Sequence, residues 1–540
     1  MSISVTFLGG LGEIGRNCAA IEIDGKLALI DCGLMFPEED MLGVDLVLPD
    51  FAWMIDRADD VECVILTHGH EDHVGALSYF LAEINVPVYG TELTVNLAAS
   101  RLEENRIDAK LHAMEDNEWR EVGPFRFKLV PVSHSIPQGS GVAFDTDEGI
   151  IVHSGDFKLD PTPIDNRPTD LPTFAELGRE GVRLLLADST NAEVPGFVSS
   201  ESSLGRNLYD IIAAAEGRVV AACFASHIHR VQQIVDAALA DGRKIAFLGR
   251  SMLRNMEIGR DLNIVDVPDD QVIPIDQVSD HDPGRTIVIC TGSQGEPFAA
   301  LSLMAAGEHR NVKIGDGDTV LISATPIPGN EKKVSRVING LLKTGADVVH
   351  GRNAKVHVSG HAAESELLTF LNVVRPQAFV PVHGEYRMLR AHAALAEAMD
   401  VADVFVCEDG DRIVVDGNKT FVERRAVPAG YVYLDGSMVG DVKRAIRDRR
   451  HLADEGVVVI TVGVDSTTGE IVYGPDLDSH GLMDQPAEML AMVAREVEKA
   501  IASGNPDPDA VRRHVYETAR RIIKSETRLR PVVLPVVIEF

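Results

Sequence analysis

Residues 67–75 read T-H-G-H-E-D-H-V-G and place four candidate metal ligands within six positions: His68, His70, Asp72 and His73. The preceding residues 61–66 alternate and are β-branched, which predicts a strand, and residues 74–81 are apolar at helical spacing. The cluster is therefore expected on a strand-to-helix loop, where residues two apart point to the same side and can bind one ion. Imidazole nitrogens with a carboxylate suit zinc. The alternative is a histidine-rich surface loop without metal.

The length of 540 residues predicts about three domains. We find no apolar run long enough for a transmembrane helix, and the N-terminus enters a strand without the basic segment of a signal peptide. We therefore expect a cytoplasmic protein without a membrane association. The net charge of −32 argues against non-specific electrostatic binding of nucleic acid by the whole surface. It is compatible with a nucleic-acid enzyme that has a local basic channel.

The first two-thirds of the chain changes character twice. Residues 1–204 carry short strand patterns with interspersed helices, which predicts an α/β sandwich. Residues 205–350 alternate strand and helix patterns, with strands expected at Arg218–Phe224, Lys244–Leu248, Thr286–Cys290 and Thr319–Ser323. That alternation predicts a parallel-sheet α/β domain inserted into the first. Residues 351–422 are expected to complete the sandwich.

The last part of the chain predicts a linker and a small α+β domain. Residues 423–455 are rich in glycine and charge, which is typical of a linker. Residues 456–540 contain a strand pattern, two helix patterns and a final strand pattern. We expect a β-α-α-β order there. The second helix pattern carries a run of basic residues, which indicates either a partner or RNA contact or a solvated helix face.

Three more candidate ligands follow strand patterns: His134 in P-V-S-H-S, Asp156 in H-S-G-D-F and His383 in P-V-H-G-E. Each alone is more often an ordinary loop residue, but together they complete two coordination spheres. We predict His68, His70 and His134 on one zinc ion, Asp72, His73 and His383 on a second, and Asp156 as the bridge. Two such ions, about 3.5–4 Å apart, activate a shared water and stabilise the attacking and leaving oxygens of phosphodiester hydrolysis.

This pattern resembles the metallo-β-lactamase superfamily. Asp188 in A-D-S-T-N, His361 in H-V-S-G-H-A and His383 resemble the three additional motifs of the β-CASP nucleases. The segments F-L-G-G-L-G-E-I-G-R-N from residue 7 and F-P-E from residue 36 are similar to those of bacterial ribonuclease J. The resemblance covers essentially the whole chain and implies an αββα sandwich with an inserted parallel-sheet β-CASP domain and a small C-terminal α+β domain.

The resemblance also implies catalytic roles for Asp72, Asp188 and His361. Asp188 is expected to orient a histidine ligand, and His361 to face the scissile phosphate and stabilise charge in the transition state. A histidine at the position of His361 accompanies the RNA-directed members of the family. RNA phosphate-binding elements are implied at Ser226, His227, Ile228 and His229, and at His357, Val358, Ser359, Gly360 and His361. Many relatives carry a serine near Ala363, so one hydroxyl contact to a 5′-phosphate is in doubt here.

The expected function is that of a zinc-dependent ribonuclease, a 5′→3′ exonuclease with endonuclease activity in RNA maturation and decay. The partners implied are single-stranded RNA with a 5′-monophosphate, a second copy or three further copies of the chain, and an RNA-degradation complex. Two alternatives stay open. A small-molecule metallohydrolase would need neither the inserted domain nor His361, and a catalytically dead scaffold would have lost ligands that are all present here.

Two further features have weaker interpretations. The stretch L-G-G-L-G-E-I-G from Leu8 mimics a dinucleotide-binding fingerprint, but no βαβ unit frames it. Asp45 and Asp435 could join a structural calcium site, as in some relatives, although a plain loop role is the simpler interpretation.

Overall fold

The computed structural model describes residues 3–296, 298–327, 329–436, 438–440, 442–482, 486–502 and 507–540. The chain divides into two compact units. The first contains residues up to Phe36 and Leu46–Val432, and the second contains Pro37–Asp45 and Tyr433–Phe540. None of the helices in the described part of the chain combines the length and the apolarity that crossing a membrane requires. The division at Val432 falls inside the segment 423–455 that the sequence predicts to be a linker.

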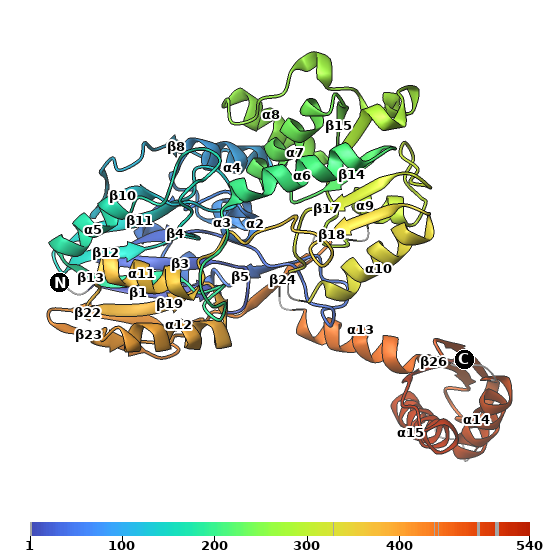
Figure 1. Ribbon diagram of the computed structural model, residues 1–540. Helices are drawn as coiled ribbons and strands as arrows, with labels where there is room; N and C mark the ends of the chain where they lie inside the picture. Colours follow the sequence, from blue (N-terminus) through green and yellow to red (C-terminus); the bar gives the residue numbers. More distant parts are fainter. Residues whose placement is uncertain are drawn as a thin grey trace. The chain divides into compact units, whose positions relative to one another are not determined.

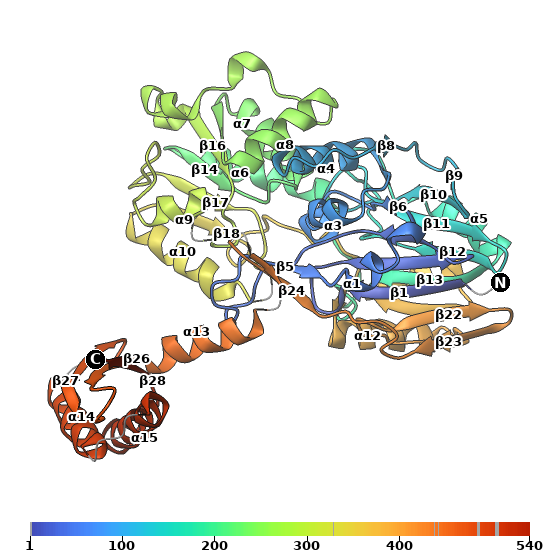
Figure 2. The same ribbon diagram turned by 180° about the vertical axis from the view of Figure 1, so that it is seen from behind.

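Two mixed sheets face each other in the first unit (Figures 1 and 2). The eight-stranded sheet has the order β23-β22-β1-β3-β4-β6-β7-β8. Its strands are β1 (Ile3–Gly9), β3 (Cys18–Ile23), β4 (Lys26–Ile30), β6 (Val61–Ile65), β7 (Val88–Gly90), β8 (Leu111–Ala113), β22 (Arg412–Asp416) and β23 (Lys419–Glu423). The seven-stranded sheet has the order β21-β19-β13-β12-β11-β10-β9. Its strands are β9 (Arg120–Val122), β10 (Phe125–Pro131), β11 (Ser140–Thr146), β12 (Gly149–His153), β13 (Val182–Asp188), β19 (Ala378–Val382) and β21 (Asp403–Val404).

Strand alternation explains how the sandwich is filled. Along β1, Val5 and Phe7 enter the core between the sheets, whereas Leu8 belongs to the core on the outer face, as the two-residue period of a strand requires. Helices cover both outer faces. The eight-stranded sheet is covered by α1 (Ala52–Ile55), α3 (Leu77–Glu83) and α4 (Glu92–Glu104). The seven-stranded sheet is covered by α5 (Leu171–Glu180), α11 (Glu364–Val374) and α12 (Tyr386–Ala398).

The inserted domain, green and yellow in Figure 1, is a five-stranded parallel sheet of order β15-β16-β14-β17-β18. Its strands are β14 (Val219–Ala222), β15 (Lys244–Leu248), β16 (Thr286–Cys290), β17 (Thr319–Ile322) and β18 (Asp347–His350). One face packs against α6 (Gly205–Ala214), α7 (Ile228–Ala240) and α8 (Arg250–Asp261), and the other against α9 (Ala300–Ala305) and α10 (Glu331–Lys343). Two of the four strands expected here, Lys244–Leu248 and Thr286–Cys290, have the bounds that the sequence predicts.

The segment 423–455 contains regular structure beyond the end of β23. It holds β24 (Tyr431–Asp435), the short strand β25 (Met438–Gly440) that pairs with it, and α13 (Lys443–Glu455). The helix was missed because its sequence is strongly charged and only Ile446 is buried. The absence of an apolar stripe removed the periodic signal on which helix prediction depends.

The second unit ends in a three-stranded sheet of order β27-β26-β28. Its elements are β26 (Val457–Val464), β27 (Ile471–His480), α14 (Pro486–Ile501), α15 (Pro508–Thr527) and β28 (Val532–Glu539). The predicted β-α-α-β order was wrong by one strand. β27 escaped prediction because it is mostly exposed and carries Gly474, Pro475 and two aspartates, residues that normally interrupt strands.

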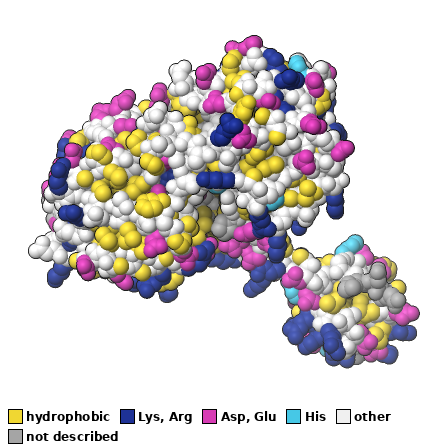
Figure 3. Space-filling view, viewed as in Figure 1, with side chains coloured by type: hydrophobic (Ala, Val, Ile, Leu, Met, Phe, Trp, Pro, Cys, Tyr) yellow, Lys and Arg dark blue, Asp and Glu magenta, His cyan; other side chains and the backbone are white. Residues whose placement is uncertain are grey.

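Acidic and basic side chains are interspersed over the face of the first unit shown in Figure 3, with apolar patches between them. The basic residues in α15 and just after it are all exposed. They are Arg512, Arg513, Arg520, Arg521, Lys524, Arg528 and Arg530. The opposite side of α15 buries apolar residues such as Val515 and Ile523.

Candidate active site

The candidate metal ligands converge at one edge of the sandwich although they span more than 300 residues of sequence. His68 and His70 lie on the loop after β6, and Asp72 and His73 on the short helix α2 (Glu71–Val74). The other three follow strands of the second sheet: His134 follows β10, Asp156 follows β12, and His383 follows β19. The structure thus brings all seven predicted ligands into two groups of neighbouring donor atoms.

The first group consists of three imidazoles. His68 Nε2 lies 2.9 Å from His70 Nδ1, and His134 Nε2 lies 3.2 Å from the same nitrogen. Nitrogens bound tetrahedrally to one zinc ion at about 2.0–2.1 Å would be about 3.3 Å apart. The observed separations therefore fit three ligands of a single ion.

The second group is built around the carboxylate of Asp156, which is 3% exposed. Its Oδ2 lies 3.1–3.8 Å from the Nε2 atoms of four histidines: His383, His73, His68 and His134. Asp72 Oδ2 lies 3.6 Å from both His73 Nε2 and His383 Nε2. Asp156 is thus a carboxylate that neighbours histidines of both groups, as a bridging ligand must.

The electrostatics of the two groups differ. Burial lowers the pKa of His68 and His134, and it lowers that of His70 to about 4, so these imidazoles are neutral and keep a lone pair for a metal. Burial also lowers the pKa of His73 and His383, but neighbouring carboxylates, Asp156 foremost, outweigh it and raise both. The field at the second group therefore favours a cation. The donor chemistry at both groups fits zinc.

Asp31 is a functional residue that the sequence did not reveal. Its Oδ2 lies 2.7 Å from His73 Nδ1, and its two oxygens accept hydrogen bonds from the N–H and hydroxyl of Thr67. Holding Nδ1 leaves Nε2 of His73 directed at the metal group. The only signal in the sequence was a single acidic residue at the end of an apolar strand pattern. In the structure, Asp31 has a left-handed backbone conformation with φ +58°.

His361 stands beside both metal groups. Its ring centroid lies 4.9 Å from that of His134 and 5.4 Å from that of His383. Its Nδ1 lies 2.8 Å from Asp188 Oδ2. Burial lowers the pKa of His361, but Asp188 outweighs it and raises the pKa to about 9. The Asp188 side chain forms a hydrogen bond with His361. Among the described residues it forms none with the seven candidate metal ligands.

The predicted phosphate-binding residues occupy mixed environments. Ile228 and Val358 are part of the hydrophobic core, and His229 is buried with Nε2 3.3 Å from Asp165. Ser226 and His357 are partly exposed. His357 Nδ1 lies 3.0 Å from the Thr325 hydroxyl.

The segment around Ser359 and Gly360 is tied to the metal ligands. The Ser359 hydroxyl accepts hydrogen bonds from Asn191 Nδ2 and from the N–H of His361. The Gly360 carbonyl accepts a hydrogen bond from His134 Nδ1 at 2.8 Å. A Cβ on Gly360 would lie 2.8 Å from the His134 ring, so only glycine fits this approach. Ala363 is fully buried and its N–H donates to Glu366.

The stretch from Leu8 forms the end of β1, the two-residue strand β2 (Leu11–Gly12) and a turn, with no helix in residues 9–17. This geometry is incompatible with a dinucleotide-binding βαβ turn. β2 instead pairs with β20 (Gly384–Glu385), next to His383. At the proposed calcium position, Asp45 accepts the Gly436 N–H and Asp435 pairs with Arg449, which fits a plain loop role.

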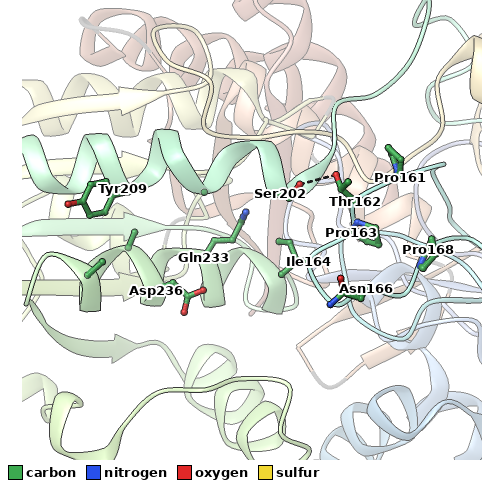
Figure 4. A pocket seen from close by; sticks show the side chains of 13 residues that line it. Pro161, Thr162, Pro163, Ile164, Asn166, Pro168, Ser202, Tyr209, Gln233 and Asp236 are labelled. Carbon is green, nitrogen blue, oxygen red and sulfur yellow. Dashed lines mark hydrogen bonds between the residues drawn. The ribbon is translucent and has the colours of Figure 1, made fainter.

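A cavity of about 780 Å³ lies between the loop after Asp156 and the helices α6 and α7 (Figure 4). Pro161, Pro163 and Ile164 of the loop after Asp156 form one wall, and Tyr209, Gln233 and Asp236 of α6 and α7 form the other. No candidate metal ligand lines it. The candidate metal ligands therefore lie outside this cavity.

Family models match the chain in four consecutive segments. The metallo-β-lactamase superfamily matches residues 11–204, and the ribonuclease J β-CASP domain matches residues 216–341. The Zn-dependent metallo-hydrolase RNA specificity domain matches residues 347–407, and the ribonuclease J C-terminal domain matches residues 444–540. The fold class expected from the sequence is thereby confirmed.

Two curated relatives match over nearly their full length. Ribonuclease J of Mycobacterium tuberculosis (strain CDC 1551 / Oshkosh) is 42% identical over 99% of this chain and 97% of its own. Ribonuclease J2 of Bacillus subtilis (strain 168) is 36% identical over 100% of this chain and 99% of its own. A solved structure of a protein of unknown function from Enterococcus faecalis V583 shares the fold, with a TM-score of 0.55 and 16% identity over 77% of this chain and 100% of its own. The chain belongs to the ribonuclease J family.

Proposed function

We propose that this chain is a zinc-dependent ribonuclease that binds two zinc ions and acts as a 5′→3′ exonuclease with endonuclease activity. The observation that carries the proposal is the position of Asp156 Oδ2 among four histidine nitrogens, with His361 beside them. The match to an RNA specificity domain and the names of the relatives support RNA as the substrate.

Each residue has a defined task in this proposal. His68, His70 and His134 would hold one ion, and Asp72, His73 and His383 the other, with Asp156 between them. When bound, two zinc ions supply a nucleophile at neutral pH and stabilise charge on the phosphate. Asp31 fixes the orientation of His73 through Nδ1.

His361 is the residue that would donate a hydrogen bond to the scissile phosphate. Asp188 accepts at Nδ1, which leaves Nε2–H as the group available to the substrate. Against the effect of burial, Asp188 raises the pKa of His361 to about 9 and so favours the protonated ring, which would donate a charged hydrogen bond to a phosphate oxygen. In the reaction, the oxygen of a water molecule would bond to the phosphorus as the bond to the 3′-oxygen breaks. The 3′-oxygen would leave as a hydroxyl with a proton released by that water, and the downstream product would keep the 5′-phosphate.

The biological setting is part of the same proposal. We expect the chain to work in the cytoplasm in RNA maturation and decay, as a homodimer or homotetramer, and within an RNA-degradation complex. Single-stranded RNA with a 5′-monophosphate is the expected preferred substrate of the exonuclease.

One uniformly labelled RNA, prepared with a 5′-triphosphate, a 5′-monophosphate or a 5′-hydroxyl, tests the proposal. The zinc-loaded protein should release mononucleotides fastest from the monophosphate form, and internal fragments from all three. Substitution of His361 by alanine should lower kcat on the order of 10²–10³-fold at unchanged zinc content. Intact RNA after incubation with protein that holds two zinc ions would instead favour a small-molecule hydrolase, and protein that binds no zinc would favour a scaffold.

A further inference from the structure

Arg230 is a charged residue with no exposed side-chain surface. It lies in the first turn of α7, and its relative exposure is 0%. Burying a guanidinium carries a large desolvation cost unless every donor is paired. We therefore expect that the buried guanidinium holds its hydrogen-bonding partners in a particular arrangement.

The guanidinium of Arg230 joins three separate segments of the chain. Its Nε and Nη2 donate to Glu201 Oε1 at 2.9 and 2.5 Å. Its Nη1 donates to the Ser323 hydroxyl at 2.6 Å and to the Val356 carbonyl at 2.8 Å. The Ser323 hydroxyl donates to the same Val356 carbonyl at 2.6 Å. Arg230 thus connects the segment before α6, the end of β17 and the segment that leads into His357.

Glu201 extends this connection to the part of the sandwich that carries the candidate metal ligands. Its Oε1 lies 3.4 Å from His227 Nε2, and its own N–H donates to Asp160 Oδ2 at 2.9 Å. Asp160 is four residues beyond the bridging ligand Asp156. Burial raises the pKa of Glu201, but His227 and Arg230 outweigh burial and lower it, so Glu201 is ionised at neutral pH.

The two segments that Arg230 and Glu201 hold are the two that the resemblance to the β-CASP nucleases implies for contact with the RNA phosphates. Residues 226–229 lead into the turn that contains Arg230, and Val356 directly precedes residues 357–361. The ring centroids of His227 and His357 lie 6.2 Å apart. Both segments come from the carboxyl ends of parallel strands, where open α/β sheets bind their ligands.

We propose that Arg230, held by Glu201, is a positioning residue that sets the distance between segments 226–229 and 356–361 and thereby the fit of the RNA backbone. The inference rests on the proposed function, since it concerns the binding of that substrate. Arg230 touches no candidate metal ligand in the described contacts, and its contact with segment 356–361 is at Val356, four residues before the Gly360 carbonyl that holds His134. Its main effect is therefore expected on substrate binding.

The chain offers a matched control in Arg243. This second arginine is 2% exposed, and its guanidinium donates to Asp241 and to backbone carbonyls that include Gly217 and Ala215. Gly217 precedes β14, so Arg243 lies at the amino end of the same sheet, opposite the loops with His227 and His357. Replacing Arg243 removes packing and hydrogen bonds of the same kind, but it changes no contact of the loops with His227 and His357.

The test compares Arg230→Lys with Arg243→Lys in the full-length zinc-loaded protein. A lysine keeps the charge but cannot bridge three partners at once. We expect KM for single-stranded RNA to rise at least about 10-fold in Arg230→Lys, with kcat within about threefold of wild type. Zinc content and the visible absorption of the cobalt-substituted protein should match wild type, and Arg243→Lys should lower Tm similarly with an unchanged KM.

Ser323→Ala is the milder variant if Arg230→Lys does not fold, because it removes one hydrogen-bonding partner only. It should raise KM about threefold. Equal KM values in wild type and Ser323→Ala or Arg230→Lys would overturn the inference, as would a change in the cobalt spectrum that parallels the loss of activity. A wild-type protein that leaves RNA intact would mean that the proposed function itself has failed.

Discussion

Replacing Gly360 by alanine tests whether the backbone of residues 356–361 positions a metal ligand. The added Cβ would lie 2.8 Å from Cε1 and Nδ1 of His134 and 3.0 Å from Cβ of Ser135. Ordinary van der Waals contact begins at 3.4 Å, so the His134 ring or the loop must move by about 0.6 Å. Neither can move freely, because His134 is 4% exposed and Nδ1 is bonded to the Gly360 carbonyl.

This displacement is large compared with what a metal site tolerates. Ligand distances in zinc sites hold within about 0.2 Å, and a misplacement of about 1 Å near the reacting groups costs on the order of 100-fold in rate. Overpacking of this kind destabilises a fold by about 1–3 kcal/mol. We therefore expect Gly360→Ala to fold, to lose zinc from the group of His68, His70 and His134, and to lose on the order of 100-fold in kcat.

Elemental analysis after gel filtration measures the zinc content, and RNA hydrolysis measures kcat. Gly351→Ala is the matched control, because a Cβ there meets no atom within 4 Å and φ is not left-handed. The control should keep wild-type zinc and activity. If Gly360→Ala also kept both, the contact between Gly360 and His134 would not position the ligand and the reasoning would be refuted.

Three further predictions concern the orientation of the ligand His73, the removal of the metal, and the dependence of stability on pH. Asp31→Asn should weaken zinc binding by about 10–100-fold, measured by competition with a coloured chelator, because it disturbs the hydrogen bond to His73 Nδ1; unchanged affinity would exclude an orienting role. Dialysis against EDTA should abolish RNA hydrolysis and lower Tm, with both restored by zinc, because ligands that bind the folded state stabilise it; an unaltered Tm would count against a metal centre. Burial and Glu13 raise the pKa of Asp409 to about 7 against the effect of Arg16, whereas an unfolded aspartate titrates near 3.9. The folded state therefore binds more protons between about pH 4 and 7, so the free energy of unfolding should fall from pH 5 to pH 7 more in the wild type than in Asp409→Asn. An equal change in both proteins, measured by urea denaturation, would contradict this.

The local parts of the site could be predicted from the sequence. The spacing of His68, His70, Asp72 and His73 is a pattern within one loop, and His134, Asp156 and His383 each follow a strong strand pattern. The structure brings them together because parallel and antiparallel strands of one sandwich end at the same edge. The sheets themselves follow from apolar runs such as residues 61–66, whose alternation needs no long-range information.

The partners of these ligands could not be predicted in the same way. Asp31 contacts His73 across 42 positions and Glu201 contacts Arg230 across 29, and neither pair has a local pattern. The burial of His229 follows from its place in the first turn of α7, where it faces Asp165. Such pairings depend on how loops meet after folding, which composition and periodicity do not encode.

The position of β1 has a consequence for how the chain is made. β1 pairs with β3 on one side and with β22 on the other, and Ile3 lies opposite Val415. At about 5–20 residues per second, a ribosome needs roughly 20–80 s to reach β22 after it has made β1. For that time one edge of an almost entirely buried strand is unpaired, and such edges promote aggregation. Nascent chains of this protein are therefore expected to depend on chaperones until β22 emerges, and slow translation should increase their aggregation.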